Sequence, residues 1–210
     1  PEILRANLAE VILKMIALQI GDVRKFPFID PPAPKSILDG FALLTELNAI
    51  TEKKQKSHKN TGPSYKLTEK GLRMAKIHTD PRLSSMLLEA EAQGCEREMR
   101  IIASALSIMD PKERPMEKAR VADAAHAAFT HPSSDFMGLL NIWEAYHRFG
   151  KPRKTSSRMR KYCRENFLSY KRMREWQDVY AQLTDILEEE GEKPKPSKKA
   201  PDSDPETRYA

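Results

Sequence analysis

The spacing of apolar residues in the C-terminal half is the feature that most constrains the fold of this chain. From Asp80 to Leu187 these residues recur at intervals of three and four, the pattern of amphipathic helices that bury one face. Capping residues, prolines and glycines interrupt the pattern repeatedly, so it describes several helices rather than one. The spacing therefore predicts a helical bundle over residues 80–187.

The individual helices can be located from their end signals. Asp80 can accept hydrogen bonds from the first turn of a helix, Pro81 suits the first helical position, and Gly94 ends that helix. Further helices are expected over residues 99–106, 115–129, 157–165 and 169–187, with another beginning after Ser134.

The apolar stripes also name the expected core. We expect Leu106, Leu139 and Trp143 to be buried. The apolar residues of the helix after Ser134 are Phe136, Leu139, Leu140 and Trp143. On the final helix the stripe consists of Tyr170, Met173, Trp176, Tyr180, Leu183 and Leu187. This spacing favours packing of the rings of Trp176 and Tyr170 over their stacking on nucleobases.

The first 79 residues carry a different pattern. Helical spacing covers residues 3–18 and the segment around Phe41, and four prolines over residues 26–34 exclude a helix between them. Residues 51–63 contain no aliphatic residue and lie between short strand-like runs, which predicts a β-hairpin with a flexible tip. With a third helix capped by Thr68, the pattern predicts a winged helix.

The predicted fold class is therefore mainly α. A winged-helix domain with a short β-hairpin, residues 1–79, precedes the helical bundle of residues 80–187. Residues 188–210 contain twelve charged residues and four prolines, a composition that cannot bury enough apolar surface to offset the entropy of ordering. We expect this last segment to be a mobile linker.

Composition limits the kinds of partner. No apolar run approaches the ~20 residues that a membrane span needs, so no membrane contact is expected. Cys95 and Cys163 are far apart and lack neighbours at metal-ligand spacing, as in cytoplasmic chains with buried thiols. His126 and His131 are five residues apart and do not share a helical face, so no metal site is predicted.

Positive charge is concentrated in one segment. Residues 148–174 hold eleven Lys or Arg and one acid, Glu165, within a chain of net charge +6. Such a cluster is typical of a surface that binds a polyanion. The nucleic-acid-binding residues predicted here are Arg153, Lys154, Arg158, Arg160, Lys161, Arg164, Lys171, Arg172 and Arg174. A solvated helix face is the alternative interpretation.

The hairpin tip is a second basic segment. Its possible contacts with nucleic acid are Lys53, Lys54, Lys56 and Lys59. Catalytic motifs, by contrast, are not found: the chain has neither a Gly-x-x-x-x-Gly-Lys-Ser/Thr loop nor an Asp-Glu-Ala-His sequence. We predict no catalytic residue, no cofactor and no ATP turnover for this chain by itself.

Six short motifs follow one another along the chain. They begin at Pro1 (PEILR), Phe26 (FPFIDPP), Asp80 (DPRL), Ile108 (IMDPKERP), Ser134 (SDFMGLLN) and Asn166 (NFLSYKRM). In this order they resemble the helicase-associated region of DEAH-box RNA helicases, most closely the large bacterial ATP-dependent members. The resemblance covers residues 1–187 and identifies the bundle as a ratchet-like domain.

The resemblance implies a longer parent protein. That parent would be an ATP-dependent RNA helicase, an ATP hydrolase that uses ATP and magnesium on motor domains placed before this region. An OB-fold would follow. The implied partners are single-stranded RNA, the motor domains and the OB-fold; the protein would be a cytoplasmic monomer. In this family the winged helix mainly packs against the other domains.

Two further hypotheses assign the chain to other functional classes than an accessory module of a helicase. A DNA-binding winged-helix regulator with a helical dimerisation domain predicts a symmetric dimer and sequence-specific duplex binding. The chain shows no clear polar recognition helix, which argues against it. A protein-interaction scaffold predicts no salt-sensitive binding of nucleic acid.

Overall fold

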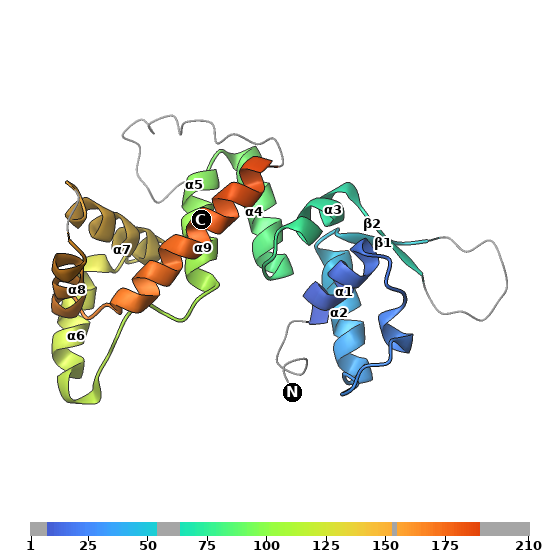
Figure 1. The fold of residues 1–210 in the computed structure, drawn as a ribbon, viewed down its shortest axis with the longest axis horizontal. Coiled ribbons are helices and arrows are strands. Elements are labelled where there is room, and N and C mark those ends of the chain that lie inside the picture. The colour runs from blue at the N-terminus through green and yellow to red at the C-terminus, as the bar shows by residue number, and fades with distance from the viewer. Residues whose placement is uncertain (1–7, 54–63, 153–154, 190–210) are drawn as a thin grey trace. The chain divides into compact units, whose positions relative to one another are not determined.

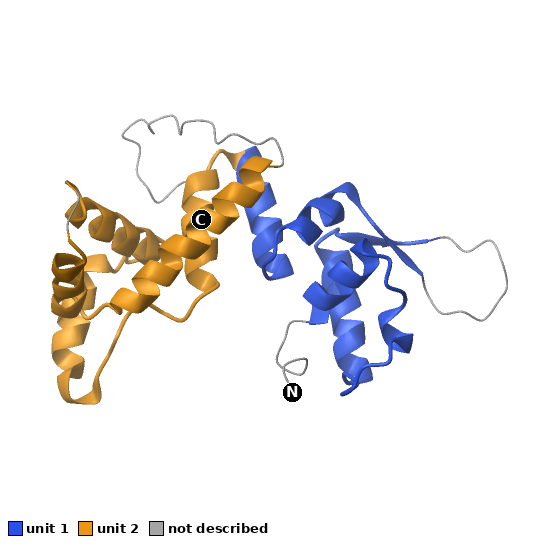
Figure 2. Cartoon of the chain, in the orientation of Figure 1, with its two compact units in different colours: residues 1–92 blue, residues 93–210 orange. Residues whose placement is uncertain are grey.

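The fold was analysed in a computed structural model, which describes residues 8–53, 64–152 and 155–189. These residues are mainly helical and include a single two-stranded hairpin, as predicted (Figure 1). The chain divides into two compact units, residues 1–92 and residues 93–210 (Figure 2). Within the described parts, no helix is both long and apolar enough to cross a bilayer.

The first unit contains helices and the hairpin. Its elements are α1 (Leu8–Ala17), the short 3-10 helix η2 (Val23–Lys25), α2 (Pro34–Glu46), β1 (Ile50–Glu52), β2 (Tyr65–Leu67), α3 (Glu69–Lys76) and α4 (Pro81–Gln93). The strands are antiparallel, with Ile50 opposite Leu67. Helix α1 packs against α2 and α3, so that Ile12, Leu44 and Met74 are buried in one core.

The start of α3 lies very close to the residues before β1. Thr68 caps the helix as predicted, since its hydroxyl oxygen accepts from the backbone N–H of Gly71 at 2.9 Å. The same hydroxyl lies 2.6 Å from the carbonyl oxygen of Asn48, and the Thr68 N–H donates to the carbonyl of Ala49 at 3.0 Å. A side chain at position 71 would overlap that Ala49 carbonyl, so glycine is needed there.

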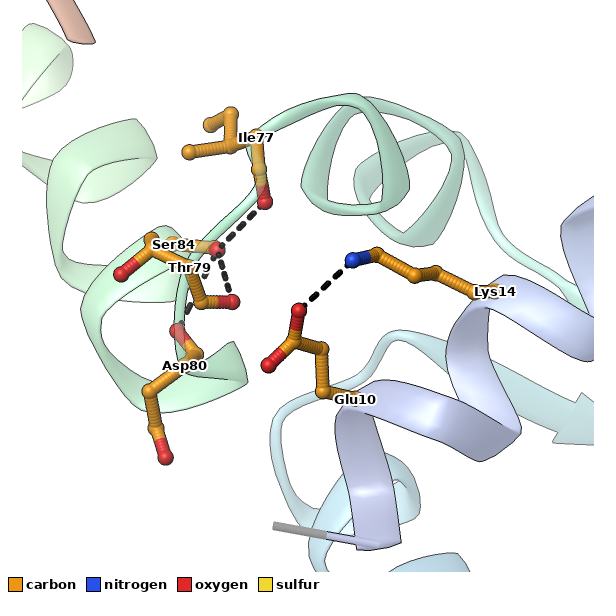
Figure 3. A network of polar contacts seen from close by, with 6 residues as sticks. All are labelled: Glu10, Lys14, Ile77, Thr79, Asp80 and Ser84. Carbon is orange, nitrogen blue, oxygen red and sulfur yellow. Dashed lines mark hydrogen bonds and ion pairs between the residues drawn. The ribbon is translucent and has the colours of Figure 1, made fainter. Parts of the chain in front are cut away.

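The turn between α3 and α4 is held by the buried hydroxyl of Ser84. Its oxygen lies 3.2 Å from the carbonyl oxygen of Asp80, 3.4 Å from that of Thr79 and 3.5 Å from that of Ile77 (Figure 3). The Asp80 carboxylate accepts from the backbone N–H of Arg82 at 2.8 Å, which confirms the predicted cap.

The described elements of the second unit are all helices. Its elements are α5 (Glu96–Leu106), η3 (Met116–Lys118), α6 (Ala119–His126), η4 (Ala127–Phe129), α7 (Asp135–Phe149), α8 (Ser156–Glu165) and α9 (Tyr170–Glu189). Helix α5 packs against both α7 and α9. Fully buried Trp176 lies in this core, where its indole N–H is 3.0 Å from both the Ile101 carbonyl oxygen and the Ser104 hydroxyl oxygen.

Some predicted core positions were wrong. Leu106 is 47% exposed, because α5 ends there and the chain turns away at Ser107. Phe136 is 45% exposed in the first turn of α7, ahead of the residues that reach the core. Leu139 is only half-buried, whereas Trp143 is buried as predicted.

Two predicted helices differ in extent. The single helix expected over residues 115–129 is a short α-helix, α6, with a 3-10 turn at each end, a common way for helix ends to tighten. Helix α9 continues to Glu189, two residues beyond its predicted end. The rest of the expected linker, residues 190–210, lies outside the described residues, and the boundary between residues 79 and 80 stays a prediction.

Candidate nucleic-acid interface

Helix α8 separates an apolar inner side from a basic outer side. Met159 and Cys163 are four residues apart and buried, so they fix the face that packs against the bundle. The four predicted cations of this helix are all exposed: Arg158, Arg160, Lys161 and Arg164. Arg158, Lys161 and Arg164 are spaced three residues apart, so these three side chains project from one side of the helix.

These four cations have different surroundings. The Lys161 ammonium lies 3.8 Å from a Glu165 carboxylate oxygen, and the Arg160 guanidinium lies over the Tyr170 ring at 5.3 Å from its centroid. Within the described part of the chain, Arg158 and Arg164 have no ion-pair partner. Arg158 and Arg164 are therefore the most available to an added anion.

The start of α8 also suits an anion. The Thr155 hydroxyl oxygen caps the helix by accepting from the Arg158 N–H at 3.4 Å, and the first turn contains no acidic residue. Free amides and the helix dipole make such an end favourable to phosphate. Arg153 and Lys154, which precede this end, lie outside the described residues.

The three cations predicted on α9 divide into two kinds. Lys171 and Arg174 are exposed. Arg172 is half-buried, and its guanidinium donates to the backbone carbonyl of Asp110 at 2.9 Å. Arg172 therefore connects α9 to the segment 110–115 of the same unit, a role that the charge pattern did not indicate.

Segment 110–115 is bound to the turn between α8 and α9 by backbone hydrogen bonds. The Glu113 N–H donates to the Phe167 carbonyl at 2.8 Å, and the Ser169 N–H donates to the Pro111 carbonyl at 2.8 Å. Lys112 and Leu168 form an antiparallel β-bridge. The motifs that begin at Ile108 and Asn166 are therefore in contact, and the orientation of α8 relative to α9 depends on both.

A histidine completes this junction. His126 Nε2 lies 3.0 Å from the Phe167 carbonyl oxygen, which can only accept, so Nε2 carries the proton. Phe167 has φ of 52°, in the left-handed region that a residue with a side chain rarely adopts. Two donors to one carbonyl hold this backbone conformation in place.

The thiol of Cys163 faces the core of the second unit. The thiol is buried, and burial, followed by the negative charge of Glu113, raises the pKa of Cys163 to about 11. A thiol in this state is neutral at physiological pH and is a poor nucleophile. No group of three His, Cys, Asp or Glu side chains within the described ranges could hold a metal ion.

The hairpin cations belong to the first unit. Lys53 is exposed directly after β1, and its N–H donates to the Ser64 carbonyl at 2.7 Å. Lys54, Lys56 and Lys59 lie outside the described residues. Contact of the hairpin tip with nucleic acid therefore stays a prediction.

Part of the chain matches a known protein family. Residues 80–139 match the family described as helicase associated domain (HA2), ratchet-like. This match and the two relatives described next confirm the resemblance to a helicase-associated region that the six motifs indicated.

Two curated relatives are similar over most of the chain. It is 47% identical over 193 residues to the ATP-dependent RNA helicase HrpA of Escherichia coli (strain K12), covering 91% of this chain and 14% of that protein. It is 45% identical over 183 residues to the HrpA homolog of Haemophilus influenzae, covering 87% of this chain and 14% of that protein. The chain thus spans about one seventh of their length.

Proposed function

We propose that this chain is an accessory module of an ATP-dependent DEAH-box RNA helicase and that it contacts the backbone of single-stranded RNA without regard to sequence. The observation that carries this proposal is the outer side of α8, where Arg158, Arg160, Lys161 and Arg164 are exposed above a buried apolar side. The two relatives with RNA helicase names support the choice of RNA as the polyanion.

Backbone contact follows from the chemistry of the surface. Arginine and lysine bind phosphate oxygens strongly, and such contacts carry no direct sequence information. Ring faces that could stack on bases are scarce here, because Trp176 is fully buried and the Arg160 guanidinium lies over Tyr170. Lys171 and Arg174 on α9 extend the cationic surface, whereas Arg172 is used in packing.

The proposed role in the whole helicase is to close the RNA channel. The winged helix and the ratchet-like bundle would cover the motor domains, which bind ATP and magnesium and hydrolyse ATP. The basic side of α8 would hold phosphates while the motor steps along the strand. The OB-fold would be a further partner in the same polypeptide, and the protein would act as a cytoplasmic monomer.

The proposal is tested by titrating labelled poly-pyrimidine and mixed-sequence RNA at several salt concentrations. Arg158, Arg160, Lys161 and Arg164 are replaced together by alanine. If roughly four phosphates are contacted, the slope of log affinity against log salt should be about −3 for a single strand. The quadruple variant should bind all sequences more weakly and with a shallower slope, while its melting temperature changes little.

A matched pair of variants separates this surface from general loss of charge. Two double variants each remove two exposed positive charges from the second unit: Arg158→Ala/Arg164→Ala and Lys118→Ala/Arg120→Ala. Only the first pair should weaken RNA binding substantially. Equal affinity of the parent chain and the quadruple variant would exclude α8 as the contact surface. Failure of the parent chain to bind at low salt would favour the scaffold hypothesis.

A further inference from the structure

A cavity of about 1060 Å³ lies within the first unit, and none of its lining residues belongs to the RNA contact proposed on α8 and α9. Its walls come from the C-terminal half of α1, from η2, from strand β2 and from Lys53 and Ser64 beside the strands, with Phe41 of α2 and Leu72 of α3. The size is at or above the upper end of small-molecule pockets, which hold roughly 300–1,000 Å³. Several side chains of a ligand could therefore enter at once.

The cavity has an aliphatic floor. Ile12, Met15 and Val23 line it and are otherwise buried in the core of the unit. Leu72, which also lines it, is 53% exposed. A half-exposed leucine next to buried aliphatic side chains offers apolar surface that a ligand can remove from water.

The rim of the cavity is positively charged. Lys25, Lys53 and Lys66 line it, are exposed, and have no ion-pair partner within the described ranges. The one acid among the lining residues, Asp22, is paired with Arg24, whose Nε and Nη2 donate to the carboxylate at 2.8 and 2.7 Å. Three lysines therefore remain available for carboxylates of a ligand.

The aromatic rings of the cavity are already paired with other groups. The rings of Phe41 and Tyr65 stack with centroids 4.6 Å apart, and the Arg24 guanidinium lies over Phe41 at 5.8 Å. Phe41 thus contacts both the Tyr65 ring and the Arg24 guanidinium. The surface left for a ligand is aliphatic and cationic, which favours a peptide over nucleobases, because bases bind single-strand sites by stacking on ring faces.

We propose that this cavity binds an acidic amphipathic segment of another protein. Aliphatic side chains of the segment contact Leu72 and the half-buried Ile16, which also lines the cavity, and its carboxylates pair with Lys25, Lys53 and Lys66. Amphipathic segments of this kind bind grooves through apolar anchors spaced three and four residues apart. Charge complementarity gives the orientation and the rate of association.

The test uses the 210-residue chain and a fluorescent amphipathic peptide with leucines at i, i+3, i+4 and i+7 and glutamates elsewhere. Binding is followed by anisotropy for the parent chain, for Leu72→Glu and for Lys25→Glu/Lys66→Glu. The control is Leu38→Glu, since Leu38 is 66% exposed and does not line the cavity. Circular dichroism and thermal melting show that each variant is folded.

We expect about tenfold weaker peptide binding for each cavity variant, equivalent to about 1.4 kcal/mol, and no change for Leu38→Glu. A scrambled peptide of the same composition should bind more weakly than the patterned one. Equal affinity of the cavity variants and the parent chain, or no binding by the parent, would overturn the proposal. Loss of RNA binding in Leu72→Glu with unchanged peptide binding would instead assign the cavity to nucleic acid.

Discussion

The guanidinium of Arg172 donates a hydrogen bond to the backbone carbonyl of Asp110, 2.9 Å away and 62 positions earlier in the chain. The neighbouring cation, Lys171, is exposed. Two adjacent basic residues of the same motif therefore have different uses, one in packing and one available to an anion. The two uses can be separated by replacing each side chain in turn and measuring stability and RNA affinity.

Replacing Arg172 by alanine should destabilise the fold by about 1 kcal/mol, because one charge-assisted hydrogen bond at the surface is lost. Lys171→Ala should leave the free energy of unfolding nearly unchanged. RNA affinity should fall more for Lys171→Ala than for Arg172→Lys, which keeps the charge. Denaturant unfolding and RNA titration measure the two effects, and equal stability of Arg172→Ala and the parent chain would contradict the packing role.

The indole of Trp176 should contribute strongly to the stability of the second unit. Trp176→Ala removes a fully buried ring and should cost about 3–5 kcal/mol. Ser104→Ala removes only one of the two acceptors of the indole N–H and should cost about 1 kcal/mol, since the Ile101 carbonyl remains. Urea unfolding followed by circular dichroism compares the two. Similar losses for both would mean that the hydroxyl, not the ring, dominates.

Two glycines should respond very differently to alanine. At Gly71 a Cβ would overlap the Ala49 carbonyl, and backbone must move, so we expect a loss of about 3 kcal/mol or more. At Gly94 there is open space but φ is +67°, so strain alone should cost about 1–2 kcal/mol. Thermal melting of the single variants gives the order, and a tolerated Gly71→Ala would show that α3 does not approach β1 this closely.

The two thiols should react at different rates. Cys163 is buried with a pKa of about 11, whereas Cys95 is half-buried. Near neutral pH, iodoacetamide should therefore modify Cys95 first in the folded chain and both thiols in urea. Mass spectrometry of the peptides identifies the modified residue, and rapid folded-state labelling of Cys163 would contradict its burial.

The raised pKa of Cys163 also predicts how stability depends on alkaline pH. The folded state favours the neutral thiol, so its contribution is fully present below the unfolded pKa of about 9 and is lost as pH rises from there towards 11. Cys163→Ala lacks this dependence. Its melting temperature should therefore fall less than that of the parent chain over this interval.

The ion pair of Asp22 and Arg24 predicts the opposite dependence at acidic pH. Hydrogen bonds from Arg24 hold the pKa of Asp22 below its ordinary value of 3.8. A lowered folded-state pKa contributes stability above the unfolded value, and this is lost as pH falls through the folded value. Asp22→Asn should therefore melt slightly lower near neutral pH, and the difference should vanish in acid. Because the pair is partly exposed, the effect at neutral pH should not exceed about 1 kcal/mol.

Local features of the fold could be predicted because their causes are local. The cap at Thr68, the cap at Asp80 and the burial of Trp176 follow from side-chain chemistry and three-and-four spacing within one helix. The cations of α8 were located from the concentration of positive charge over residues 148–174, and the structure shows all four exposed while Met159 and Cys163 are buried. Helix ends were less predictable, as Leu106 and Phe136 show, because the first or last turn of a helix can extend beyond the core.

By itself, the sequence determined that this protein is mainly helical, which faces of its helices are buried, and where its positive charge is concentrated. Only the tertiary structure decided that Arg172 binds Asp110 while Lys171 stays exposed, and that residues 110–115 pair with the turn after α8. The physical reason is the distance along the chain over which each interaction acts. Helix periodicity and capping act over a few residues, whereas these hydrogen bonds join segments more than fifty residues apart, and no local pattern encodes which carbonyl a distant donor will meet.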